Sequence, residues 1–220
     1  DLSSYRDLTA LAWLFPPRDA DEPWKVLVRY WIPEANIEQR VRADLVPYDV
    51  WIAQGFIRPT PGNVVDKDHI EAAILEDAAR FRVQQIGYDR LYADQLVQHL
   101  MAEGLTMVPV GMGFFGMAAA VREAETMISG QRLAHGGNPV LRWNAANTSV
   151  IQDTGGNKRP KKGEDVERNR IDGIVAYLMA VSRALVQPEY SESVYETRGL
   201  LKITALDDEE AEAHLVGATQ

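Results

Sequence analysis

The fold class is decided by residues 83–110, which read VQQIGYDRLYADQLVQHLMAEGLTMVPV. A short β-rich run at 83–87 is followed by helical spacing over 91–103, and Gly104 suits the C-terminal cap of that helix. A second apolar, β-rich run occupies 106–110. A strand, a helix and a second strand in this order predict an α/β fold.

The segments on either side extend this prediction. Two β-rich runs precede it, joined by a loop of prolines and acids, and further helices surround it. We expect strands at 8–15 and 25–32, helical spacing over 34–54 until Pro47, a turn at 59–63, helices at 66–82, 117–129 and 172–185, and a polar, basic hairpin within 151–169. Early hairpin strands followed by strand–helix alternation predict a sheet of mixed direction flanked by helices.

Composition limits the class of protein. The chain has 220 residues, of which 46% are hydrophobic, so one domain with a proper core is expected. The absence of cysteine excludes a disulfide framework and a thiolate zinc site. The apolar stretches fall far short of the roughly 20 residues that span a bilayer, and the N-terminus lacks a signal region. We therefore expect a soluble, intracellular protein without a membrane partner.

The charge is unevenly distributed along the chain. The formal net charge is −9, and residues 189–220 hold eight acidic and two basic residues, so most of the negative charge belongs to this segment. Residues 157–163, by contrast, form a basic run that reads NKRPKKG. A local basic patch, and not the total charge, decides whether a phosphate backbone can dock. The acidic balance therefore does not exclude a nucleic-acid partner.

Three aspartates occupy one kind of position, at a strand end or a helix start. Asp1 precedes the first predicted strand, Asp89 follows the strand at 83–87, and Asp172 opens the last apolar helix. In an α/β sheet such positions meet at one edge, where ligands usually bind. Three carboxylates gathered there would repel one another unless a divalent cation neutralised them, and hard oxygen ligands suit Mg²⁺ or Mn²⁺. Two such ions can promote hydrolysis of a phosphodiester.

Each aspartate also has a simpler explanation when it is taken alone. Aspartate at a helix start is a common N-cap, which fits both Asp89 and Asp172, and aspartate after a strand is typical of turns. Spacing alone therefore does not assign the metal ligands.

Five short blocks, in one order along the chain, carry a resemblance to a known family. They read DLSSYRDLT at 1–9, TPGNVVD at 60–66, IGYD at 86–89, HGGNPVLRW at 135–143 and RIDGIVA at 170–176. Together they resemble the C-terminal nuclease domain of the phage terminase large subunit, in the branch typified by lambdoid and related siphophages. The resemblance runs from Asp1 to about Leu185, which is nearly the whole chain.

The resemblance implies a ribonuclease H-like fold and a divalent-metal-dependent endodeoxyribonuclease. Such an enzyme would cut concatemeric viral DNA at the start and end of genome packaging, with little sequence specificity. The metal-binding acids of the family fall on Asp1, Asp89 and Asp172, which would hold two Mg²⁺ or Mn²⁺ ions, and Asp7 is a fourth candidate.

The resemblance also implies partners. These are double-stranded DNA, the portal protein, the small terminase subunit and the ATPase domain of the same polypeptide, in the cytoplasm of the infected host. The basic residues Lys158, Arg159, Lys161 and Lys162 would contact the DNA backbone beside the cleavage site. Their alternative interpretation is an ordinary solvated loop.

The chain departs from the family pattern in two respects. It contains no G-x-x-x-x-G-K-[ST] phosphate loop, so we expect a nuclease domain without its ATPase. The first expected strand is also mostly missing, so we expect residues before Asp1 in the native protein. We assign residues 1–188 to the nuclease domain and 189–220 to an acidic C-terminal tail.

Two other features resemble a dinucleotide-binding loop and a catalytic histidine, but their surroundings in the sequence do not support these roles. The loop at 111–116 reads G-x-G-x-x-G between a strand and a helix, yet the acid that a dinucleotide site needs about 20 residues later is missing. We interpret it as a tight loop near the active edge. His135 lies beside two glycines, and a turn or packing role is favoured for it over catalysis.

Two other functions compete with the nuclease. The first is a packaging interaction module that docks on the portal or on DNA and is nearly inactive as a nuclease in isolation. The second is an ATPase of the sugar-kinase or actin type, which also opens with a strand and a DLSS-type hairpin. That fold would need a second related half with another phosphate loop, and this chain is too short to contain it.

Overall fold

The computed structural model describes residues 1–2, 8–35, 37–91, 94–166 and 168–186. Asp7 and the acidic segment 189–220 lie outside the described residues, so their predicted roles stay predictions. The described chain has the predicted mixed α/β fold, with strands and helices alternating after an initial hairpin.

The largest sheet is built around one long strand. β1 (Thr9–Phe15) pairs antiparallel with β2 (Trp24–Pro33), as the predicted hairpin requires. Two short strands, β3 (Ile57–Thr60) and β6 (Leu133–Ala134), pair parallel with opposite ends of β2. Because β1 occupies one edge of β2, β3 and β6 both pair with the opposite edge. On that opposite edge the middle of β2, between β6 and β3, is unpaired.

The remaining strands form two pairs. β4 (Ile86–Tyr88) and β5 (Met107–Pro109) run parallel and are joined through α4 (Asp94–Ala102), as the βαβ pattern of the sequence predicts. β7 (Thr148–Gln152) and β8 (Lys158–Lys162) form an antiparallel hairpin. The basic run is therefore itself a strand of that hairpin.

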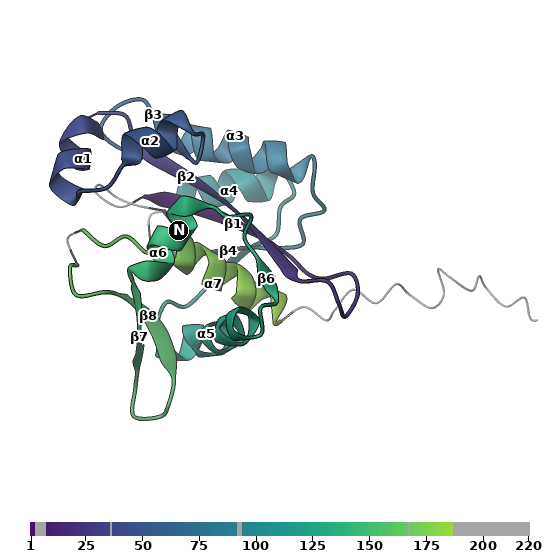
Figure 1. Cartoon of the computed structure of the whole chain (residues 1–220). Coiled ribbons are helices and arrows are strands. Elements are labelled where there is room, and N and C mark those ends of the chain that lie inside the picture. Colours follow the sequence, from purple (N-terminus) through teal and green to yellow (C-terminus); the bar gives the residue numbers. More distant parts are fainter. Residues whose placement is uncertain (3–7, 36, 92–93, 167, 187–220) are drawn as a thin grey trace, which may run out of the picture. The chain divides into compact units, whose positions relative to one another are not determined.

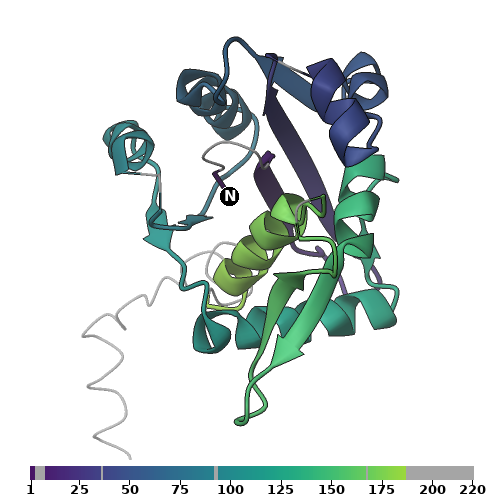
Figure 2. The ribbon, with the colours of Figure 1, turned by 90° about the vertical axis from the view of Figure 1, so that its left-hand side faces the viewer.

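Helices cover both faces of the central sheet (Figures 1 and 2). Besides α4, they are α1 (Ile37–Asp44), α2 (Tyr48–Ala53), α3 (Lys67–Ala78), α5 (Phe114–Ser129), α6 (Pro139–Ala146) and α7 (Asp172–Ala184). α3 and α4 lie on one face, while α5, α6 and α7 lie on the other. No helix among the described residues is long and apolar enough to cross a membrane.

The alternation of side chains along β2 divides the interior into two cores. Val28, Tyr30 and Ile32 point into the core that α7 helps to form, whereas Trp31 joins Trp13 in the core beneath α3. Successive residues of a strand point to opposite faces, so three consecutive buried residues, Tyr30, Trp31 and Ile32, show that this end of β2 is covered on both sides.

A buried charge fixes α3 onto the sheet. Asp77 of α3 is fully buried and accepts hydrogen bonds from Trp13 Nε1 at 2.7 Å and from Arg29 Nε at 2.6 Å. The second nitrogen of the Arg29 guanidinium also pairs with this carboxylate. Both strands of the hairpin therefore contribute a donor, and the carboxylate is compensated as a buried charge must be.

The structure differs from the sequence-based expectations at the short strands. Residues 59–63 were predicted as a turn, but Pro59 lies within β3, and β6 was not predicted at all. Among the described strands β3 pairs with β2 alone, and a strand edge tolerates the missing N–H of proline. α5 also begins three residues earlier than predicted, at Phe114.

Candidate active site

Asp172 is the first residue of α7 and is buried, with 5% of its surface exposed. The backbone around it is held by Asn144 of α6, which is fully buried. Asn144 Nδ2 donates to the carbonyl of Arg170 at 2.9 Å, and the N–H of Gly173 donates to Asn144 Oδ1 at 3.0 Å. One asparagine therefore brackets Asp172 on both sides and fixes the direction in which its side chain leaves the helix.

Gly173 allows β2 to approach this turn. A Cβ atom at this position would overlap the hydroxyl of Tyr30 and would stand 2.6 Å from Asn144 Oδ1. Burial, and then the charge of Asp172, raise the pKa of the Tyr30 hydroxyl well above its ordinary value. The phenol is consequently neutral and lies close enough to Asp172 to respond to its charge.

Asp89 follows β4 directly, and its backbone is also positioned by a glycine. A Cβ on Gly87 would stand 3.0 Å from the Val110 side chain and 3.1 Å from Arg183 Cγ, so β4 and α7 are in close contact here. Asp89 Oδ1 accepts a hydrogen bond from the N–H of Leu91 at 3.1 Å. The N-cap interpretation of Asp89 is wrong, because the two residues that follow it, Arg90 and Leu91, are not helical.

Asp1 lies beside the start of β1. Its α-amino group donates to the carbonyl of Ala10 at 2.8 Å, and the N–H of Ala10 donates to the carbonyl of Asp1 at 2.9 Å. The carboxylates of Asp172 and Asp89 lie close enough to this end of β1 for their charges to act on the backbone nitrogen of Asp1. Both carboxylates are therefore near Asp1, and the three predicted ligands belong to one region of the molecule.

The chemistry of these donors fits a hard divalent cation, since all three offer carboxylate oxygens. Two of them stand on backbone that glycine contacts hold in place, at Gly87 and Gly173. Among the residues that the structure describes, however, no three acidic or imidazole side chains converge closely enough to surround one ion. Their assignment as metal ligands therefore stays a prediction.

A buried cation stands two residues before Asp172. Arg170 is 3% exposed, and its Nη2 lies 3.4 Å from Asp44 Oδ2 at the end of α1. The hydroxyl of Tyr48 donates to the same carboxylate at 3.0 Å, and burial is the main cause that raises the pKa of Tyr48. This chain of contacts ties the Asp172 turn to α1 and α2.

The predicted DNA-binding residues divide into two groups. Lys158 Nζ forms an ion pair with Glu125 of α5 at 2.6 Å, and the Arg159 guanidinium lies 4.9 Å above the ring of Phe114. Lys161 is exposed, and Lys162 is half-buried. The first two side chains therefore attach the hairpin to α5, and Lys161 faces solvent.

The base of this hairpin is anchored beside Asp172. The N–H of Gly163, just after β8, donates to the carbonyl of Asn147 at 2.8 Å. Asn147 Nδ2 donates in turn to the carbonyl of Arg170 at 3.2 Å, the same carbonyl that Asn144 binds. The basic strand and the Asp172 turn are thus linked by consecutive hydrogen bonds.

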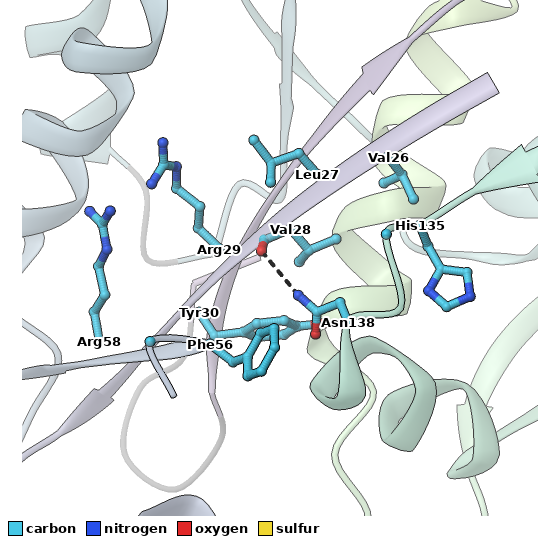
Figure 3. Close-up of a pocket in the computed structure, with 11 residues that line it drawn as sticks. Val26, Leu27, Val28, Arg29, Tyr30, Phe56, Arg58, His135 and Asn138 are labelled. Atoms are coloured by element: carbon cyan, nitrogen blue, oxygen red, sulfur yellow. Dashed lines mark hydrogen bonds between the residues drawn. The ribbon is translucent and has the colours of Figure 1, made fainter. Parts of the chain in front are cut away.

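His135 lies in a different place, in a cleft at the unpaired middle of β2 (Figure 3). The cleft is also lined by Arg58 of β3 and by Asn138, whose Nδ2 donates to the carbonyl of Val28 at 3.5 Å. Asn138 Oδ1 caps α6 through the N–H groups of its first turn. His135 is therefore part of the turn that leads into α6, as the sequence favoured.

Sequence reasoning missed the residues that position the aspartates. Asn144 and Tyr30 touch the Asp172 turn, yet neither stands at a strand end or a helix start. Asn144 does carry one signal, because it is a polar residue within the apolar pattern of α6. A buried asparagine must find hydrogen-bond partners, and here those partners are the site backbone.

Comparisons with known proteins give a consistent result. A family model described as terminase large subunit, endonuclease domain, matches residues 1–188. The terminase large subunit of Enterobacteria phage HK97 is 37% identical over 186 residues, which cover 84% of this chain and 36% of that protein. Protein YmfN of Escherichia coli strain K12 is 27% identical over 197 residues, which cover 84% of this chain and 42% of that protein.

The fold has a counterpart among solved structures. The crystal structure of the HK97 bacteriophage large terminase matches with a TM-score of 0.75 and 37% identity, over 83% of this chain and 38% of that chain. This likeness confirms the predicted fold class. The chain spans less than half the length of the curated relatives described above.

Proposed function

The chain belongs to the family of terminase large-subunit endonuclease domains, and from this membership we propose that it is a divalent-metal-dependent endodeoxyribonuclease. It cuts concatemeric phage DNA during genome packaging, with little sequence specificity. Its partners are double-stranded DNA, the portal protein, the small terminase subunit and an ATPase domain of the same polypeptide, in the cytoplasm of the infected host.

One observation carries this proposal. Asp172 begins α7, which packs on both β1 and β4, while Asp1 pairs with Ala10 of β1 and Asp89 directly follows β4, so acids from three separate segments share one region. Acids gathered from distant parts of a chain repel one another and cost stability, and a bound cation offsets that cost. Structural aspartates that cap helices have no need to be gathered in this way.

In this proposal Asp1, Asp89 and Asp172 hold two Mg²⁺ or Mn²⁺ ions. When bound, the ions supply the positive charge that activates water and stabilises the departing oxygen of the phosphodiester. Asn144 orients Asp172 through the backbone on both sides of it. Lys161 holds the DNA through its phosphates and reads no bases, which agrees with cutting that has little sequence specificity.

The test is cleavage of supercoiled plasmid by the purified chain in Mn²⁺, in Mg²⁺ and in EDTA. We expect nicked and then linear DNA with either ion and intact plasmid in EDTA, because acids without ions cannot supply the positive charge. Digesting plasmids of unrelated sequence should give similar rates. Cleavage that persists in EDTA would contradict metal dependence, and DNA binding without any cleavage would favour the interaction module.

Lys161→Ala is expected to weaken DNA binding to about the same degree for every sequence. A lysine that neutralises one phosphate contributes a slope of about one to the dependence of log affinity on log salt concentration, so the variant should lose about that much. Fluorescence anisotropy with a labelled duplex, titrated at several salt concentrations, measures both quantities.

Lys25→Ala is the matched control for this measurement. Lys25 is also an exposed lysine on a strand, but it lies at the N-terminal end of β2. Asp1 pairs with Ala10, which lies opposite Tyr30 and so five residues further along β2, and Lys25 is therefore remote from the proposed site. The salt slope of this variant should equal that of the wild type. Equal slopes for the Lys161 and Lys25 variants would exclude the hairpin from the phosphate contacts.

A further inference from the structure

A closely packed loop leads from β5 into α5. A Cβ on Gly116 would overlap the carbonyl of Gly111, so the two ends of the loop at 111–116 are in direct contact. Only glycine at position 116 permits this contact. The loop therefore holds Phe114 and Phe115, the two aromatic residues before Gly116, in a defined position.

The two phenylalanines have different surroundings. The Phe114 ring lies under the guanidinium of Arg159, at 4.9 Å from ring centroid to Cζ. Phe115 is 93% exposed, the largest value among the large hydrophobic side chains of the described chain. A single exposed apolar side chain is ordinary on a surface. Here, however, the exposed ring stands on a fixed backbone and is next in sequence to a ring that contacts a cationic strand, and exposed aromatic rings near cations are typical of sites that bind single-stranded nucleic acid.

The loop lies at the same edge of the structure as Asp89. β4 and β5 are parallel neighbours, so their C-terminal ends meet, and the N–H of Val110 donates to the carbonyl of Tyr88 at 2.8 Å. Asp89 follows one of these strands and the phenylalanine loop follows the other. On its other side the loop meets the basic hairpin through the contact between Arg159 and Phe114.

We propose that Phe115 stacks on an unpaired base of the DNA strand near the scissile phosphate, so that locally opened DNA is the preferred substrate. The inference rests on the proposed nuclease function and specifies the form of DNA that this site takes. Every base has a flat face, so stacking provides affinity without sequence recognition. Arg159 and Lys161 would hold the backbone of the same strand, and the ring would hold its base.

The chemistry around Phe115 favours a base over an apolar protein surface. Its neighbour Phe114 is covered by a guanidinium, and the adjoining strand β8 carries three further basic residues. An apolar partner would have to bury or displace these charges, which is costly without compensating acids. A nucleotide offers a ring for Phe115 and a phosphate for the cations.

The test compares binding of two labelled duplexes that differ only in a central mismatched bubble. With Ca²⁺ in place of Mg²⁺, anisotropy should show tighter binding of the bubble by the wild-type chain. Phe115→Ala should lower affinity for the bubble about fivefold or more and leave the perfect duplex nearly unchanged, as the loss of one base–aromatic contact predicts. Phe115→Trp should retain the preference.

Ile128→Ala is the matched control. Ile128 is 59% exposed on the same helix but lies about 20 Å further along it, so its loss should change neither affinity. An unchanged preference for the bubble in Phe115→Ala would overturn the inference while leaving the nuclease assignment intact. A wild-type chain that neither binds nor cuts either duplex would instead contradict the proposed function.

Discussion

Asp172→Ala is expected to lower the rate of metal-dependent DNA cleavage by about a hundredfold or more. A bound divalent ion contributes several kcal/mol to stabilising the charge of the transition state, and each 1.4 kcal/mol corresponds to about a factor of ten in rate. Asp172 is the most deeply buried of the three predicted ligands, and Asn144 fixes the backbone that carries it. Initial rates of plasmid nicking in Mn²⁺ measure the effect.

The fold should survive this substitution. The Asp172 carboxylate interacts favourably with the N-terminus of α7, which contributes up to about 2 kcal/mol at a partly buried position, but its removal also relieves the cost of a buried charge. We therefore expect a thermal midpoint close to that of the wild type. A variant that still cuts at a wild-type rate in Mn²⁺ would exclude Asp172 from the site.

Asp68→Ala is the matched control for Asp172→Ala. Asp68 also lies in the first turn of a helix, α3, but it is exposed and lies on the other face of the sheet. Its removal takes away the same favourable charge at a helix start without touching the proposed site. Cleavage by this variant should match the wild-type rate.

The elements that the sequence predicts well are those whose own residues show a regular pattern of burial. In the run at 25–32 every second residue from Val26 to Ile32 enters one core, and most residues of the helix at 172–185 are apolar and buried. Each pattern therefore follows from the surroundings of its own residues. The strands β3 and β6 have four and two residues, and they exist because β2 offers them an edge. No local pattern contains that information.

The candidate site, too, was predictable only where the local sequence carries a signal. Asp89 and Asp172 could be singled out as residues at a strand end and a helix start, but the choice of these aspartates among the other acids came from the family resemblance. The residues that bring them together, Gly87 and Gly173, act through close contacts between segments far apart in the sequence. Such contacts depend on what lies opposite, which the sequence near each glycine does not specify.

Gly173→Ala is expected to destabilise the chain by about 3 kcal/mol or more and to reduce cleavage as well. The added methyl group would overlap the Tyr30 hydroxyl and crowd Asn144, and both of these side chains are fully buried with no room to withdraw. Overpacking a closed interior costs about 1–3 kcal/mol and sometimes more. Urea unfolding, followed by circular dichroism, measures the loss.

Gly113→Ala is the control for the loss of a glycine. Nothing lies within 4 Å of a Cβ at that position, and the φ of −77° suits any residue. The free energy of unfolding of the variant should therefore differ from that of the wild type by about 0.5 kcal/mol or less. Wild-type stability in Gly173→Ala would contradict the close contact with Tyr30 and with it the account of how Asp172 is positioned.

Adding Tyr30→Phe to Gly173→Ala separates steric crowding from other effects of the methyl group. The hydroxyl is the atom that the methyl group would overlap most, but ring carbon Cζ at 2.7 Å and Asn144 Oδ1 at 2.6 Å remain. The double variant should therefore regain part of the lost stability, and the two changes should not be additive, as expected for residues in contact. Recovery of cleavage should follow the recovery of stability only in part, because Asn144 is still displaced and it holds the backbone on both sides of Asp172. Full recovery of cleavage would mean that Tyr30, and not Asn144, determines where that carboxylate stands.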